Sequence, residues 1–218
     1  TKGNRSIAIG YEALAAQNFT TSTDSHNTGV GFSAGASITT GLRNTIVGSL
    51  AGDALTDADY NVAIGNNALG SDTKGNKSVA IGQAALRDQN FTSSTDTNNI
   101  AIGSDTCRSL TTGSSNTVVG TGAALDLLTG NSNTVVGARA GEEMTTADDC
   151  VAVGILAGGG DAGSATTGHD NVCVGSNAGA QLTSGASNTI IGRQAGEAIT
   201  TGGHNIMIGR QSGSHSAN

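Results

Sequence analysis

The residues best suited to bind a ligand occur in two segments that repeat each other, QNFTTSTD from Gln17 and QNFTSSTD from Gln89. An aromatic ring in a polar loop can stack on a sugar, or it can pack over the end of a core element, and both interpretations are open here. A third related segment, GGGDAGSATTGHDN from Gly158, has no Phe, which argues against a binding role common to all three. The binding candidates are Asn18, Phe19, Asp24, Asn90, Phe91 and Asp96.

Residues that could catalyse a reaction or hold a metal ion form no recognisable arrangement. The sequence has no nucleophile elbow, no phosphate-binding loop and no recurring pair of carboxylates. The four His lack ligand spacing, and Cys107, Cys150 and Cys173 sit at unrelated places in the sequence pattern. We therefore expect no enzyme, metal or cofactor, and no intrachain disulfide. A carbohydrate-cleaving fibre enzyme is an alternative that requires acidic residues along a groove.

Four Asn lie in N-x-S/T patterns: Asn4, Asn18, Asn76 and Asn90. Asn18 and Asn90 would be glycosylation acceptors if the chain matures in a glycosylating secretory system. In a chain rich in Thr and Asn such matches also arise by chance, and in a bacterial or phage protein they are inert.

The composition indicates a thin core. The 218 residues include 34 Gly, no Pro, no Trp and five Tyr or Phe, and the apolar residues are mostly Ala, Val, Ile and Leu. The net charge of −7 disfavours nucleic acid as a partner, because phosphate binding needs clustered Lys and Arg. No apolar run is long enough for this segment to insert in a membrane. The start at Thr1 suggests a fragment of a longer polypeptide.

An internal repeat covers the whole chain and organises everything else. Twelve pentads end in Gly at spacings of 17 residues, except that every fourth spacing is 21, which gives a super-repeat of 72 residues. We expect one repeat domain over 1–218 with super-repeats at about 3–74, 75–146 and 147–218. The pentads end at Gly10, Gly31, Gly48, Gly65, Gly82, Gly103, Gly120, Gly137, Gly154, Gly175, Gly192 and Gly209.

Each pentad predicts a short β-strand, because β-branched residues stand between Asn and Gly. Seventeen residues are too few for a strand, a helix and two connections, so each unit predicts one coil of an all-β parallel β-solenoid with twelve coils. Coils stack about 4.8 Å apart through backbone hydrogen bonds. Asn at pentad position 1 predicts an amide ladder. Gly at position 5 predicts a positive φ or a close backbone approach.

Both faces of the pentad strand are apolar. Position 4 is always Val or Ile, so we expect positions 2 and 4 to face the inside of the coil. Position 3 is never polar, and bulk there is often exchanged against bulk at position 2. We therefore expect position 3 to pack against a neighbouring chain. The candidates for a trimer interface are Ile46, Val118, Val135, Cys173, Ile190 and Met207.

The pentads SIAIG, SVAIG, NVAIG and NIAIG, each followed three residues later by a small residue, resemble the head repeats of YadA-like trimeric autotransporter adhesins, which also occur in phage tail-fibre proteins. The resemblance implies a left-handed parallel β-roll, a homotrimer and attachment to cells or matrix. The coils here are longer than is usual in that family, and every fourth coil is longer still.

The expected function is a structural and receptor-binding segment of an extracellular fibre, either a phage tail fibre on a virion or an adhesin on a bacterial surface. Its partner would be a glycan or protein receptor on a host cell. A homopolymeric extracellular filament is the alternative. An ice-binding solenoid is disfavoured because Thr occupies pentad position 2 in only five of twelve coils.

Overall fold

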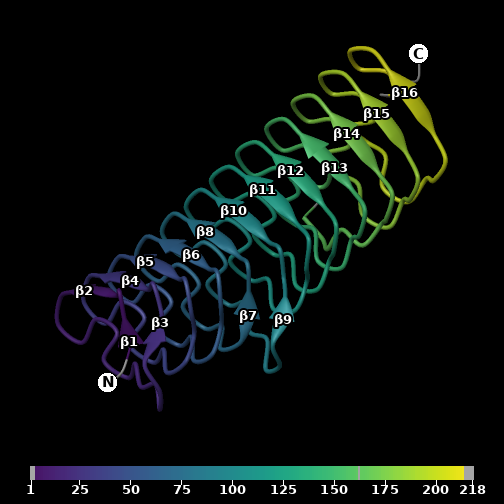
Figure 1. Cartoon of the computed structure of the whole chain (residues 1–218). Coiled ribbons are helices and arrows are strands. Elements are labelled where there is room, and N and C mark those ends of the chain that lie inside the picture. Colours follow the sequence, from purple (N-terminus) through teal and green to yellow (C-terminus); the bar gives the residue numbers. More distant parts are fainter. Residues whose placement is uncertain (1–2, 162, 214–218) are drawn as a thin grey trace. The chain divides into compact units, whose positions relative to one another are not determined.

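The computed structural model describes residues 3–161 and 163–213, and this part of the chain is all-β, without helices. The expected parallel β-solenoid with twelve coils is confirmed (Figure 1). By its internal contacts the chain divides into two compact units, Thr1–Thr112 and Gly113–Asn218. The super-repeat boundaries do not coincide with this division, and the single domain stays a prediction.

The first unit contains six pentad strands, drawn in purple to teal in Figure 1. Two pairs of two-residue strands lie at its long coils: β1 (Gly3–Asn4) with β3 (Thr23–Asp24), and β7 (Gly75–Asn76) with β9 (Thr95–Asp96). The pentad strands are β2 (Ile7–Ile9), β4 (Thr28–Val30), β5 (Thr45–Val47), β6 (Val62–Ile64), β8 (Val79–Ile81) and β10 (Ile100–Ile102).

The second unit also contains six pentad strands, drawn in green to yellow (Figure 1). Its long coil has one isolated parallel bridge, between Met144 and Thr166, where the first unit has paired strands. The pentad strands are β11 (Thr117–Val119), β12 (Thr134–Val136), β13 (Val151–Val153), β14 (Val172–Val174), β15 (Thr189–Ile191) and β16 (Ile206–Ile208).

Strands of successive coils pair in parallel at identical pentad positions. Ile46 of β5 lies beside Ala63 of β6, and Val118 of β11 lies beside Val135 of β12. This register stacks each residue on its equivalent in the next coil, so every repeat position becomes a row along the unit.

The Gly at pentad position 5 is required for the two reasons that the sequence predicts, a positive φ and a close approach of the backbone to the next coil. Its φ lies between 116° and 141° in all twelve coils, a region that L side chains rarely adopt. A Cβ on Gly65 would also collide with the carbonyl group of Gly82 in the next coil. Backbone conformation and close stacking therefore exclude other residues here.

The Asn at pentad position 1 forms the expected ladder. Oδ1 of Asn27 accepts the N–H of Asn44 at 2.9 Å, and Oδ1 of Asn44 accepts the N–H of Asn61 at 2.9 Å. Nδ2 of Asn44 donates to the carbonyl oxygen of Ala58 at 2.7 Å, which ties the strand to the far side of the same coil. These amides are fully buried, so their hydrogen bonds offset the cost of removing them from water.

The core of each coil is built from position 3 of the pentad and from positions 8, 9 and 12, where pentad position 1 is counted as the first residue of the coil. Ile46 faces Gly52 in one coil, and Ala80 faces Leu86 in another, so a large residue at one position meets a small one at the other. A Cβ on Gly52 would lie 3.0 Å from Cδ1 of Ile46. The relation does not hold in every coil, because Gly29 and Gly35 occupy both positions of one coil, and Leu14 and Ile38 lie against them instead.

Candidate functional site

The residues expected at a trimer interface lie inside their own coils, so that expectation is wrong. Position 3 is buried in every coil except the first, where Ala8 is exposed, and the last, because its side chain packs inside its own coil. Met207, in the last described coil, is half-buried. The six residues in question are Ile46, Val118, Val135, Cys173, Ile190 and Met207.

Positions 2 and 4 of the pentad face outward instead. The strand β10 shows this pattern, since Ile100 and Ile102 are each 37% exposed while Ala101 between them is buried. Position 4 is Val or Ile in all twelve coils, so each unit carries an unbroken aliphatic row on its surface. We call the outward residues of positions 2 and 4 the aliphatic face. Its most exposed members within the first unit are Ile7 and Ile9, at 53% and 60%.

The extra residues of the first two long coils form a second small sheet rather than a free loop. Gly75 and Asn76 pair with Thr95 and Asp96, and the corresponding residues pair in the same way one super-repeat earlier. Lys77 forms an ion pair with Asp96, and a hydrogen bond from the same ammonium group lowers the pKa of the Asp96 carboxyl. In the earlier coil an ion pair joins Arg5 to Asp24 at 3.2 Å.

The binding candidates of these long coils differ in exposure. Phe19 is buried, at 7% exposed, which fits packing of its ring rather than stacking on a ligand. Phe91 is half-buried, and its backbone is held by an N–H bond to Oδ1 of Asp72 at 3.0 Å. Asn18 and Asn90 are exposed. The structure thus brings the six candidates to matching places in two successive super-repeats, and their binding role stays a prediction.

A buried polar cluster lies beneath the second long coil, and sequence reasoning did not find it. Asp72 occupies a position where most other short coils have Leu, Ile or Met, and its Oδ2 accepts Nε2 of Gln89 at 2.6 Å. Gln89 also donates to Oγ of Ser78 at 3.0 Å and accepts Nδ2 of Asn99 at 2.9 Å. The cluster continues the amide ladder where Ser78 replaces Asn.

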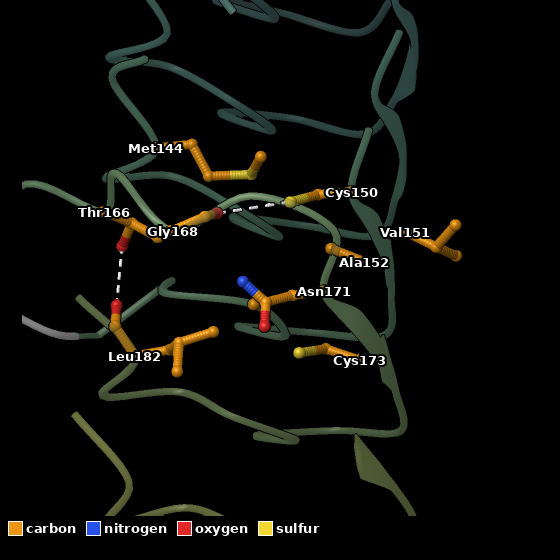
Figure 2. A pocket seen from close by; sticks show the side chains of 10 residues that line it. Met144, Cys150, Val151, Ala152, Thr166, Gly168, Asn171, Cys173 and Leu182 are labelled. Carbon is orange, nitrogen blue, oxygen red and sulfur yellow. Dashed lines mark hydrogen bonds between the residues drawn. The ribbon is translucent and has the colours of Figure 1, made fainter. Parts of the chain in front are cut away.

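The third long coil lacks this cluster and contains a cavity of about 10 Å³. Figure 2 shows Met144, Cys150 and Cys173 around it. Ala152 at position 3 and Gly158 at position 9, both small, are among the residues that line the cavity. It is too small for a substrate, since a single water molecule needs about this much space.

The three Cys are buried free thiols, as expected. Burial raises the pKa of Cys173 to about 12 and raises the pKa values of Cys107 and Cys150 as well. Sγ of Cys150 donates to the carbonyl oxygen of Gly168 at 3.4 Å (Figure 2). These thiols are therefore protonated fillers at neutral pH rather than nucleophiles.

Other candidate chemistry is sparse in residues 3–161 and 163–213. No group of three His, Cys, Asp or Glu side chains there could hold a metal ion. Among the possible glycosylation acceptors, Asn4, Asn18 and Asn90 are exposed, whereas Asn76 is buried and donates to Oγ of Ser94 at 3.1 Å. Within the same described ranges no helix has the length and apolar character needed to cross a bilayer.

An exposed aromatic pair lies at position 6 of the first two coils. The rings of Tyr11 and Phe32 stack with centroids 5.6 Å apart and planes 10° apart. Their spacing of 21 residues, one coil, is the sequence signal that indicates the pair.

Comparison of the chain with protein-family models, with curated proteins and with solved structures gives no match.

Proposed function

We propose that the chain is a structural and receptor-binding segment of an extracellular fibre, in which three copies pack through the aliphatic face. The observation that carries the proposal is this face. Val or Ile occupies position 4 of every coil although that position points out of the coil.

Packing alone does not explain an aliphatic row on the surface of a single chain. Side chains at positions 2 and 4 contribute little to the core, so a lone solenoid gains little from keeping them apolar. Contiguous apolar surface on a soluble protein is typical of an interface. A partner that repeats with the same coil spacing covers the row completely, and a parallel copy of the same chain has that spacing.

The number three comes from the resemblance of the pentads to YadA-like head repeats, which are trimeric. Rows that are identical on every chain suit cyclic symmetry, in which each subunit presents the same surface. The partners proposed are therefore two further copies of this chain and, along the fibre, a glycan or protein receptor. Nucleic acid is disfavoured by the net charge of −7.

Attachment follows from the same architecture. A stack of coils held by backbone ladders is a rigid scaffold, and the long coils recur on it at fixed intervals. Such a scaffold presents binding residues in multiple copies, which strengthens attachment to a surface. We place the protein outside the cell, in a virion fibre or on a bacterial surface, and propose no catalytic activity.

Two measurements test the proposal. Sedimentation equilibrium of the native chain should give three times the chain mass of 21.3 kDa. A fluorescently labelled chain should attach to bacterial or host cells in a saturable way. A monomer at micromolar concentration contradicts the assembly, and a mass that grows without limit indicates a filament. Failure to attach to any cell type contradicts the receptor-binding role.

A further inference from the structure

The rings of Tyr11 and Phe32 stack on each other and still leave much of their surface exposed to a ligand. Phe32 is 51% exposed although it has a coil on each side, and Tyr11 is 68% exposed. The backbone beneath the rings is fixed, because Ser33 donates its N–H to the carbonyl oxygen of Tyr11 at 2.8 Å and Leu50 donates to that of Phe32 at 2.9 Å. The rings are therefore held in place without being part of the core.

The row that contains these rings continues with polar side chains. The same hydrogen bonds recur from Asn67 to the carbonyl oxygen of Ser49 and from Ala84 to that of Asn66, at 3.1 and 2.9 Å. The side chains of the row thus follow one another at the coil spacing, about 4.8 Å. In the first unit this position-6 row consists of Tyr11, Phe32, Ser49, Asn66, Gln83 and Ser104.

The composition of the position-6 row selects among ligands. It contains no Lys or Arg, so it does not favour phosphate, sulfate or an acidic glycan. Its amide and hydroxyl groups distinguish it from the aliphatic face, whose Val and Ile suit another apolar surface. Two rings followed by hydrogen-bonding groups match a ligand that has weakly positive C–H faces and many hydroxyls.

We propose that the position-6 row of the first unit binds an extended neutral chain of pyranose sugars lying along the solenoid axis. One or two sugar rings would stack on Tyr11 and Phe32, and the following sugars would form hydrogen bonds with Asn66 and Gln83. The inference deepens the proposed attachment function and rests on it, since it names the ligand class and its place.

The test uses tyrosine fluorescence of the full chain. The sequence has two Tyr and no Trp, so a Tyr60→Phe background leaves Tyr11 as the only reporter. Cellotetraose, maltotetraose and tetra-N-acetylchitotetraose are titrated as probes, and isothermal titration calorimetry is used for the variants. Ile155→Ala is the matched control, because Ile155 is 56% exposed at position 6 in the second unit.

At least one tetrasaccharide should change the Tyr11 emission and saturate. Phe32→Ala should weaken its binding about tenfold, because an exposed stacking surface is lost, whereas Phe32→Tyr and Ile155→Ala should stay within about threefold. Binding of none of the three probes, or equal binding after Phe32→Ala, overturns the inference. A smaller oligomeric mass for the Phe32→Ala variant also overturns the inference, because it would show that the rings form a contact between subunits.

The outcome separates this inference from the proposed function. If Phe32→Ala leaves cell attachment intact, the sugar site is wrong and the attachment function stands. If the unmodified chain attaches to no cell, the attachment function fails whatever the tetrasaccharides do.

Discussion

Ile46 and Gly52 share one volume inside their coil, because a Cβ on Gly52 would lie 3.0 Å from Cδ1 of Ile46. The same complementarity recurs with the sizes reversed, as with Ala80 and Leu86. It fails in the third long coil, where the residues at positions 3 and 9 are both small and a cavity remains, and in the coil of Gly29 and Gly35, where Leu14 and Ile38 lie against the two Gly. Where the relation holds, the two residues together fill a space that neither fills alone.

Filling that cavity should stabilise the protein. Ala152→Val adds two methyl groups opposite Gly158 and should raise the free energy of unfolding by about 1 kcal/mol. The matched control is Ala80→Val, which meets Leu86 in a filled coil and should cost about 1–3 kcal/mol through overpacking. Urea denaturation of both variants measures the difference, and two changes of the same sign contradict the shared-volume explanation.

Breaking the amide ladder should cost more than removing an exposed Asn. Asn61 is buried, its Oδ1 accepts the N–H of Ser78 at 2.9 Å, and its Nδ2 donates to the carbonyl oxygen of Gly75 at 2.8 Å. Asn61→Ala leaves both partners unpaired and should destabilise by about 2–4 kcal/mol. Asn66→Ala, on the surface five residues later, should change the denaturation midpoint little. Equal midpoints for the two variants would show that the ladder is dispensable.

The thiols should be unreactive in the folded protein. Burial keeps Cys107, Cys150 and Cys173 protonated at pH 8, and the thiolate is the reactive form. Ellman's reagent should detect no thiol in the native chain within minutes and three after denaturation. Ser164→Cys, at an exposed position, is the positive control and should add one fast thiol. A fast reaction of the unmodified native chain contradicts the burial.

Stability should fall as the solution becomes alkaline. The unfolded chain loses its thiol protons near pH 8.5, while the pKa of Cys173 in the folded chain is about 12, so the folded state binds more protons between these values. The free energy of unfolding therefore decreases with pH in this range, by up to about 1.4 kcal/mol per pH unit for each buried thiol. Cys173→Ala should reduce the slope of stability against pH between 8.5 and 10. An unchanged slope would assign the effect to other groups.

Charges on the aliphatic face should separate the subunits without unfolding them. Ile64 and Ile102 point outward from β6 and β10, so Lys at both positions adds no charge to the core. The double variant should sediment as a monomer while the far-UV circular dichroism spectrum stays unchanged. Thr40→Lys, exposed on another part of the coil, should leave the mass unaltered. A trimer that survives both Lys residues contradicts the proposed interface.

Repetition in the sequence predicts the coils, their parallel register, the amide ladder and the closing Gly, because each follows from a residue type at a fixed interval. The orientation of the strand was predicted the wrong way round. Alternation says which side chains share a face, but it does not say which face is inside. The orientation is indicated by the size relation between Ile46 and Gly52, six residues apart. The size relation between positions 2 and 3, on which the prediction rested, does not indicate it.

The candidate site was less predictable, because the local sequence does not determine how exposed a side chain is. Phe19 and Phe91 stand in nearly identical segments, yet one is buried and the other is half-buried. Asp72 belongs to the coil before the second long coil and accepts a hydrogen bond from that long coil. No feature of the QNF segment therefore predicts this contact. Tyr11 and Phe32 become a pair only through stacking of adjacent coils.

The pairing of Asp72 with Gln89 restricts how such a chain can change its length. Both residues are buried and belong to different kinds of coil, the short one that precedes a long coil and the long coil itself. Inserting a single 17-residue unit between them leaves a carboxylate facing an aliphatic neighbour. An insertion at this junction therefore keeps the buried pair only if its last coil again presents a polar partner to Gln89.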